Sequence, residues 1–220
     1  MSHRESAAPG LQGRLVDRML FFSDAVFAII MTLLALELRA PEEFLANDAE
    51  LAAVLRHGAP EIVAFVGSFA IIGIFWSAHM RITRDLRQFD WSVSTANLAF
   101  LLTIALLPFT TAIAAGQGWS PLAFRIYALN ICAASAMQML LLWVEMRNGG
   151  SLVGGITSRE LVYRLLRGAA PGIAFGLGFA ASVTGHVEVA PWCWALIPII
   201  ILAANLVRPS VASQAKVCNT

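Results

Sequence analysis

Charged residues are scarce in this sequence: they make up 13% of its 220 residues, while hydrophobic residues make up 58%. A soluble domain of this length has too small an interior to bury so much apolar surface, so the composition predicts an integral membrane protein. The net charge of +1 hides how the charges are distributed, so it says nothing about nucleic acid. From the apolar composition we expect a lipid bilayer around this chain, and we expect no nucleic acid as a partner.

Motifs that would indicate catalysis or cofactor binding are missing. The sequence has no GxGxxG, no P-loop, no GxSxG and no HExxH. Its three cysteines, Cys132, Cys193 and Cys218, lack paired spacing, and its four histidines are scattered. These absences predict a protein that is not an enzyme and that has no cofactor, no disulfide framework and no resident metal.

Apolar runs of helical length, by contrast, are abundant. A spanning helix needs about 20 mostly apolar residues, and six stretches qualify: 17–38, 60–81, 93–115, 121–145, 167–185 and 191–207. No run alternates in the way that a membrane barrel requires. The sequence therefore predicts an all-α integral membrane protein with six transmembrane helices. We expect a cytoplasmic segment (1–16, with 1–13 disordered), a transmembrane domain (17–208) and a cytoplasmic tail (209–220).

Basic residues are distributed unevenly between the predicted loops. With the N-terminus inside, twelve of the 15 Lys and Arg fall in inner segments, and the remaining three are Arg39, Arg56 and Arg125. Short loops rich in Lys and Arg stay in the cytoplasm, so both termini of this multi-pass protein are predicted to be cytoplasmic, in a cell inner membrane or plasma membrane. Acidic residues gather on the outer side between the first two predicted helices, where they either concentrate cations or only keep a loop soluble; they are Glu37, Glu42, Glu43, Asp48, Glu50 and Glu61.

The fifth apolar stretch is rich in small residues. Gly172 and Gly176 form a GxxxG pattern, and small residues let helix backbones approach closely in lipid. This pattern predicts tight helix packing, with a flexible hinge as the alternative. Pro108 and Pro198 are expected to form tolerable kinks in the third and sixth helices.

The first apolar stretch combines an apolar stripe with an ionisable residue. Ionisable groups in membrane helices are costly and face a protein interior or an aqueous path. At 3.6 residues per turn, Ile29, Leu33 and Leu36 share one face and Thr32 borders it, while Asp24 falls nearly opposite. The pattern predicts a helix with two faces, one apolar and one that directs a carboxylate at a neighbouring helix.

The end of the second predicted helix offers partners for that carboxylate. Trp76 and His79 are three residues apart on one face, at the membrane depth of Arg18 and Asp24. An indole N–H and an imidazole N–H can both donate to a carboxylate. Taken alone, Trp76 suits an interfacial anchor and His79 a solvated position at a loop. Taken together, the four residues suit a buried polar cluster, and the sequence leaves both interpretations open.

The order Arg18-x-x-x-Phe22-Ser23-Asp24 resembles the R-x-x-x-F-S-D signature of the transmembrane protein 175 family, the lysosomal and prokaryotic potassium channels. "FWSAHMR" at 75–81 and "NLAFLLTIALLPFTTAI" at 97–113 resemble that family's second and third helices. Ala25 departs from the pattern, because prokaryotic members often have Gly after the Asp.

The resemblance implies a homotetramer whose central pore is lined by the first helix of each chain. It implies a constriction of apolar side-chain rings, at Ile29, Leu33 and Leu36, with Thr32 as a polar layer. Such rings would replace a carbonyl filter, and the sequence contains no TVGYG. The expected partners are further copies of the chain, the bilayer and monovalent cations, with K⁺ as the permeant ion.

The resemblance also implies a structural polar network that holds the first helix, made by Arg18, Ser23, Asp24, Trp76 and His79. The expected function is a potassium-permeable, leak-like channel, because basic residues sit at helix ends and no helix carries a voltage sensor. Two other classes stay open. One is a small proton-coupled secondary transporter, although no internal repeat is visible. The other is a membrane scaffold in which the polar cluster is only structural.

Overall fold

A computed structural model of the protein describes residues 9–38, 47–147 and 157–207. Every regular element in these ranges is a helix, which confirms the all-α prediction. The elements are α1 (Pro9–Leu36), α2 (Asp48–His57), α3 (Ala59–Thr83), α4 (Trp91–Ala105), α5 (Leu107–Gly116), α6 (Pro121–Met146), α7 (Ser158–Val183), the 3₁₀ helix η1 (Ala190–Ala195) and α8 (Leu196–Leu206).

Five helical segments are long and apolar enough to cross a membrane, and they correspond to the first five predicted spans. They are Gly10–Leu36, Ala59–Thr83, Trp91–Gly116, Pro121–Met146 and Ser158–Val183. The sixth prediction is not confirmed, because Ala190–Leu206 is a shorter apolar helix. It is divided into η1 and α8. Pro198 falls in the first turn of α8, where its missing N–H interrupts no helical hydrogen bond.

Helix starts differ most from the sequence-based boundaries. α1 begins at Pro9, so the disorder expected for 1–13 is wrong for its last five residues. α7 begins at Ser158 rather than at 167, because the Thr157 side chain accepts a hydrogen bond from Glu160 N and caps the helix. The predicted outer segment 39–59 contains α2, which Asn47 caps in the same way.

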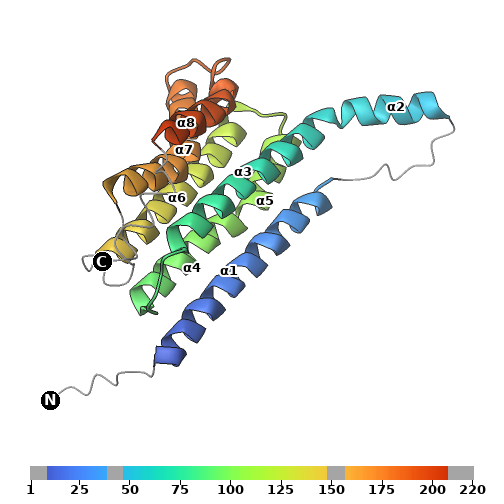
Figure 1. The fold of residues 1–220 in the computed structure, drawn as a ribbon. Coiled ribbons are helices and arrows are strands. Elements are labelled where there is room, and N and C mark those ends of the chain that lie inside the picture. Colours follow the sequence, from blue (N-terminus) through green and yellow to red (C-terminus); the bar gives the residue numbers. More distant parts are fainter. Residues whose placement is uncertain (1–8, 39–46, 148–156, 208–220) are drawn as a thin grey trace.

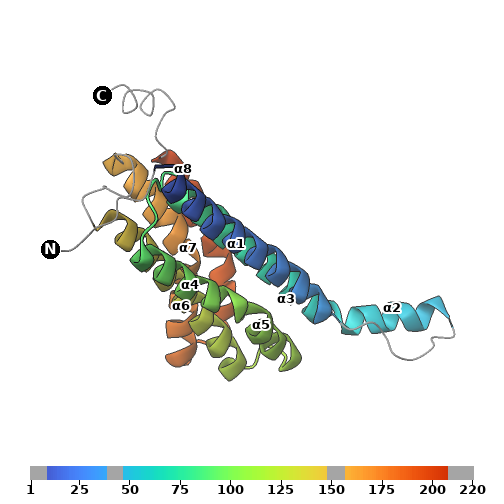
Figure 2. The ribbon, with the colours of Figure 1, turned by 90° about the horizontal axis from the view of Figure 1, so that it is seen from below.

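The helices form a bundle in which α1 lies at one side. Figures 1 and 2 show α1 beside α3, with α6 and α7 deeper in the bundle and α8 beyond them. α2 extends away from the bundle and has no buried residue. The third span divides at Leu106 into α4 and α5, with Pro108 in the first turn of α5, where a proline is tolerated.

Aromatic and aliphatic side chains from α1, α3 to α8 and η1 fill the main core, which includes Phe27, Ile71, Phe75, Phe100, Ile104, Tyr127, Phe175 and Ile197. α7 approaches α6 closely at one of the two predicted glycines. A Cβ on Gly172 would lie 2.5 Å from Cβ of Ser135, whereas one on Gly176 would lie 3.7 Å from Sγ of Cys132. Gly172 is therefore the glycine that this approach requires.

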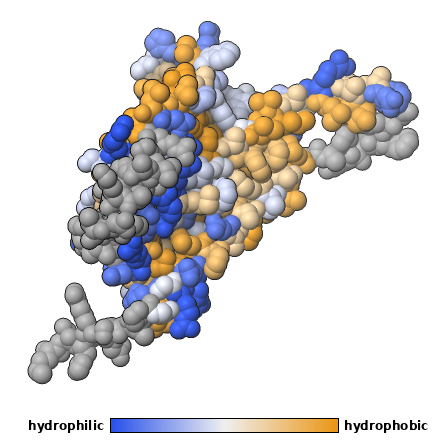
Figure 3. Space-filling model, in the orientation of Figure 1, coloured by the Kyte–Doolittle hydropathy of each residue, from blue (hydrophilic) through white to orange (hydrophobic). Residues whose placement is uncertain are grey.

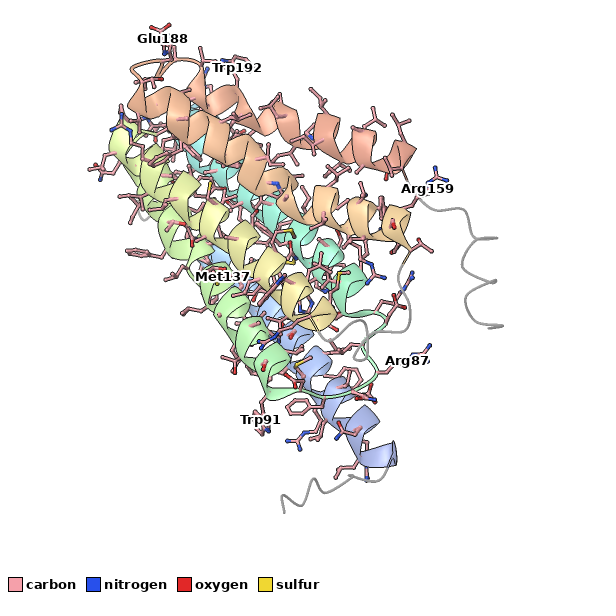
Figure 4. All side chains as sticks on the ribbon, turned by 90° about the vertical axis from the view of Figure 1, so that its left-hand side faces the viewer. Arg87, Trp91, Met137, Arg159, Glu188 and Trp192 are labelled. Carbon is pink, nitrogen blue, oxygen red and sulfur yellow. The ribbon has the colours of Figure 1, made fainter. Side chains whose placement is uncertain are left out.

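Charges and aromatic residues mark two opposite ends of the bundle. Figure 4 shows Arg87 and Arg159 toward one end and Glu188 and Trp192 at the other. Trp91 and Trp192 are 78% and 73% exposed, as expected for aromatic side chains at the two interfaces of a membrane. Figure 3 shows apolar residues over much of the face formed by α1 and α3, with hydrophilic residues near the start of α1.

Candidate functional site

α1 presents one face to the bundle. Phe27, Ile30 and Leu34 are 1–3% exposed and pack into the main core. Their spacing of three and four residues places them on one side of the helix. They pack where α1 contacts α3, α4 and α5, so this face fixes α1 to the rest of the chain.

The opposite face of α1 is uncovered. Ile29, Leu33 and Leu36 are 57%, 43% and 76% exposed, and Thr32 is exposed among them. α1 is also the most apolar of the five spans and the least buried, with 28% of its most apolar window buried against 39–50% in the others. So large an apolar face requires lipid or another protein surface to cover it.

Thr32 adds a polar atom to this uncovered face. Its Oγ1 donates to Ile29 O at 2.7 Å, so its proton is used within the helix. A hydroxyl oxygen keeps accepting capacity when its proton is donated. The oxygen of Thr32 is therefore available to a cation or a water molecule.

A buried chain of hydrogen bonds joins α1 to α4 and α3. Ser23 Oγ donates to Met19 O at 2.9 Å, Asn97 Nδ2 donates to Ser23 Oγ at 2.8 Å, and His79 Nε2 lies 2.8 Å from Asn97 Oδ1. Because an amide oxygen only accepts, His79 donates through Nε2. Ser23, His79 and Asn97 are at most 1% exposed. Because all three groups have hydrogen-bond partners, this chain of bonds fixes the rotation of α1 about its own axis.

A second link joins α1 to α3 outside the buried chain. Trp76 Nε1 donates to Asp24 Oδ1 at 2.9 Å. In the single chain Trp76 is 37% exposed and Asp24 is exposed, so of the two interpretations that the sequence left open, burial of this carboxylate is not observed. Arg18 is exposed too, and no ion pair joins it to Asp24 among the described side chains. Six residues along a helix turn a side chain about 120° away from its predecessor, which separates the two.

Asn97 is the member of the network that the sequence interpretation missed. It connects Ser23 to His79, because each of them forms a hydrogen bond with its side-chain amide. A signal was available, because an amide inside an apolar span must find a polar partner. Asn97 also begins the stretch that resembles the family's third helix.

A second buried polar chain, also missed, links α3, α5 and α6. Thr111 Oγ1 lies 2.8 Å from Ser68 Oγ, which lies 2.8 Å from the hydroxyl of Tyr127. All three residues are at most 3% exposed. Hydroxyls scattered over three spans give no sequence pattern, so only the packed structure brings them together.

At the end of the bundle near Arg87, a buried arginine on α7 bonds the end of α3 and the α3–α4 connection. Arg164 donates through Nε to Glu160 at 2.9 Å, through Nη1 to Ile82 O at 3.2 Å and through Nη2 to Asp85. Burial raises the pKa of Asp85, but the hydrogen bond and charge of Arg164, with help from Arg84, more than offset this. The pKa of Asp85 therefore lies below its usual range.

A cavity of about 310 Å³ opens at the other end, beside Leu34. Glu37, Glu61, Phe65 and Thr111 also line it, so it brings two predicted outer carboxylates together. Within the described ranges, no three His, Cys, Asp or Glu side chains are placed to hold a metal ion.

Comparison with known proteins gives one consistent result. Residues 18–108 match the family model described as endosomal/lysosomal potassium channel TMEM175. A potassium channel of Chamaesiphon minutus is 31% identical over 72% of this chain and 81% of its own length. One of Chryseobacterium is 35% identical over 43% of this chain and 46% of its own length.

The human endosomal/lysosomal proton channel TMEM175 is 29% identical over 62% of this chain, a match that spans 27% of the human protein. Among solved structures, the crystal structure of a lysosomal potassium-selective channel TMEM175 homolog from Chamaesiphon minutus superposes with a TM-score of 0.70. That match has 26% identity and covers 87% of this chain and 99% of that chain.

Proposed function

The chain belongs to the TMEM175 family, and on that premise we propose that it is a potassium-permeable, leak-like cation channel. The observation that carries the proposal is the uncovered stripe of Ile29, Leu33 and Leu36 on the most apolar and least buried span. The family consists of ion channels, so the chain is not an enzyme.

The proposed assembly is a homotetramer with α1 of each copy at the central axis. Closed rotational symmetry brings the same face of every copy to that axis. Side chains at 29, 33 and 36 then form three apolar rings, and Thr32 forms a polar layer between the first two. The bundle contacts of Phe27 and Leu34 keep the opposite face of α1 away from the axis.

An apolar ring acts on ions differently from a carbonyl filter. It offers no oxygen to replace an ion's water shell, so it blocks conduction by dewetting when narrow and passes a partly hydrated ion when wide. K⁺ holds its water less tightly than Na⁺ and is therefore favoured. The free lone pairs of the Thr32 oxygen support this preference.

The proposed setting is a cell inner or plasma membrane with both termini cytoplasmic. The separation of Arg87 and Arg159 from Glu188 in Figure 4 supports this orientation. Protons are a second candidate permeant ion, because the human relative is named a proton channel. A proton-coupled carrier and a scaffold are the alternatives that an experiment must separate.

Purified full-length protein in a planar bilayer, with K⁺ on one side and Na⁺ on the other, tests the proposal. A channel gives unitary currents and a reversal potential displaced toward that of K⁺. A carrier gives a flux that saturates with ion concentration and follows the proton gradient. A scaffold gives no current, and either of the last two results would refute the channel.

A further inference from the structure

Glu145, in the last turn of α6, is a buried carboxyl group without a partner. Its exposed fraction is 0%, and neither Oε1 nor Oε2 has a hydrogen-bond donor among the described residues. An ionised carboxylate in such a place loses its hydration and gains nothing in return. Either the group is neutral, or a cation must turn toward it.

Helix register places Glu145 at the level of the Arg164 cluster. α3 and α6 are parallel, since Ser68 bonds Tyr127 and, further along both helices, Gln138 Nε2 donates to Phe75 O at 3.0 Å. Seven residues beyond this last pair, about two turns along each helix, Glu145 is level with Ile82. The carbonyl of Ile82 is the one that Arg164 holds.

The charges of Arg164 and Asp85 act on Glu145. Glu160 and Arg84 bond this pair, Arg147 follows Glu145 by two residues, and Arg81 precedes Ile82. α4 carries no charged residue after its cap, Asp90. None of these cations bonds Glu145: Arg84 and Arg164 bond Asp85, and Arg147 lies over the ring of Trp143. Arg81 lies over the ring of Tyr163, and its buried Nε has no hydrogen-bond partner among the described residues.

We propose that Glu145 is a proton-binding site: it is the neutral acid while Arg164 binds Asp85, and loss of its proton draws Arg164 away from Asp85. The proton leaves to water from the carboxyl oxygen and no other bond breaks. The new carboxylate then competes for the guanidinium, which has N–H groups left after its three bonds.

This exchange would loosen the α3–α4 connection. Arg164 now ties Asp85 and the end of α3 to α7. α3 carries Trp76 and His79, and α4 carries Asn97, so both helices contact α1 through the polar network. The proton on Glu145 would thus adjust how firmly α1 is held. This consequence for ion flow rests on the proposed channel function, whereas the proton site itself does not.

Infrared spectroscopy of the full-length protein in lipid nanodiscs tests the site directly. At neutral pH the wild type should show the C=O stretching band of a neutral carboxyl, and Glu145→Gln should lose it. The band should fade as the pH is raised. Glu160→Gln is the matched control, because it removes a carboxylate that already bonds Arg164 and should leave the band in place. Carbon-13 labelling of glutamate should shift the band in the wild type, which needs no variant to fold.

Absence of a titrating glutamate band, or its survival in Glu145→Gln, would overturn the proposal. K⁺ flux through liposomes then tests the coupling, with pH varied on the side of the α3–α4 connection. Wild-type flux should change over the pH range in which the band titrates, and flux through Glu145→Gln should stay constant. Equal pH dependence of the two proteins would overturn the coupling. No flux in the wild type would refute the channel and leave the infrared band to decide the proton site.

Discussion

α1 and α7 are both membrane spans, but the chain holds them in different ways. α7 packs on α6 through the close approach at Gly172 and carries the fully buried Arg164, although its mean hydropathy is only 1.2. α1 has a mean hydropathy of 2.3, yet more of its surface is open. The less apolar helix is thus completed within one chain, whereas the more apolar one needs lipid or another protein surface to cover it.

The largest expected effect on stability comes from removing Arg164, which holds α7 to the α3–α4 connection. Arg164→Met leaves Asp85 and Glu160 without their buried partner, which costs about 3–5 kcal/mol of unfolding free energy. Denaturation in detergent micelles, followed by circular dichroism, measures the loss. Arg159→Met on the same helix is the control, because Arg159 is exposed and should change little. Equal stability of the two variants would mean that the Arg164 cluster does not hold α7.

The next largest effect compares the two polar links that hold α1, the buried one through Asn97 and the partly exposed one at Asp24. Asn97→Leu leaves Nε2 of the buried His79 without its acceptor, at about 1–3 kcal/mol, while Ser23 loses a donor but keeps its bond to Met19 O. Asp24→Ala removes only the acceptor of the partly exposed Trp76 and should weaken the proposed tetramer more than the fold of the single chain. Native mass spectrometry and detergent denaturation separate the two effects. If Asp24→Ala kept a full-strength tetramer and normal currents, Asp24 would matter little.

A comparable but more local effect is expected in the packing of α7. Gly172→Ala adds a methyl group that would lie 2.5 Å from Cβ of Ser135, and overpacking of this kind costs about 1–3 kcal/mol. Gly176→Ala, one turn away, meets only an ordinary 3.7 Å contact and should fold like the parent. Thermal unfolding in detergent compares the two, and equal melting temperatures would show that the helices separate freely here.

The smallest effect is the pH dependence that comes from Asp85. The pKa of Asp85 is lower in the folded chain than in the unfolded one, because Arg164 and Arg84 outweigh its burial. Its contribution is therefore fully present above the unfolded pKa and is lost as the pH falls through the folded pKa. Asp85→Asn should flatten the acid side of the stability profile, and an unchanged profile would contradict the assignment.

The sequence predicts the spans well where apolar runs are continuous, and poorly where a helix cap or a proline determines the helix boundary. Five runs form helices that are long and apolar enough to cross a membrane, but 191–207 is divided into the 3₁₀ helix η1 and α8, and hydropathy alone does not predict this division. The start of α7 was missed because its first turns carry charge, although Thr157 and Glu160 form a capping pair.

For the site, the period of α1 was sufficient to separate its two faces. Ile29, Leu33 and Leu36 are exposed, and their role as pore rings stays a prediction. The polar links depend on tertiary contacts that the sequence does not show. Trp76 donates to Asp24 as predicted, but His79 is linked to Ser23 through Asn97. Leu34 follows Leu33 in the sequence, yet it is 1% exposed and belongs to the core, so it is not a neutral control position for variants of the stripe.

The central claim is that the uncovered face of α1 lines the ion path, and Ile29→Asn tests it most directly. Asn has a similar length, but its polar atoms wet the proposed constriction. Leu129→Asn on α6 is the matched control, because Leu129 is 60% exposed and Ile29 is 57% exposed. The reversal potential in a planar bilayer, with K⁺ opposed to Na⁺, is the measurement. Ile29→Asn should raise conductance and move the reversal potential toward zero, while Leu129→Asn should match the parent. If all three proteins gave the same currents and reversal potential, α1 would not line the path.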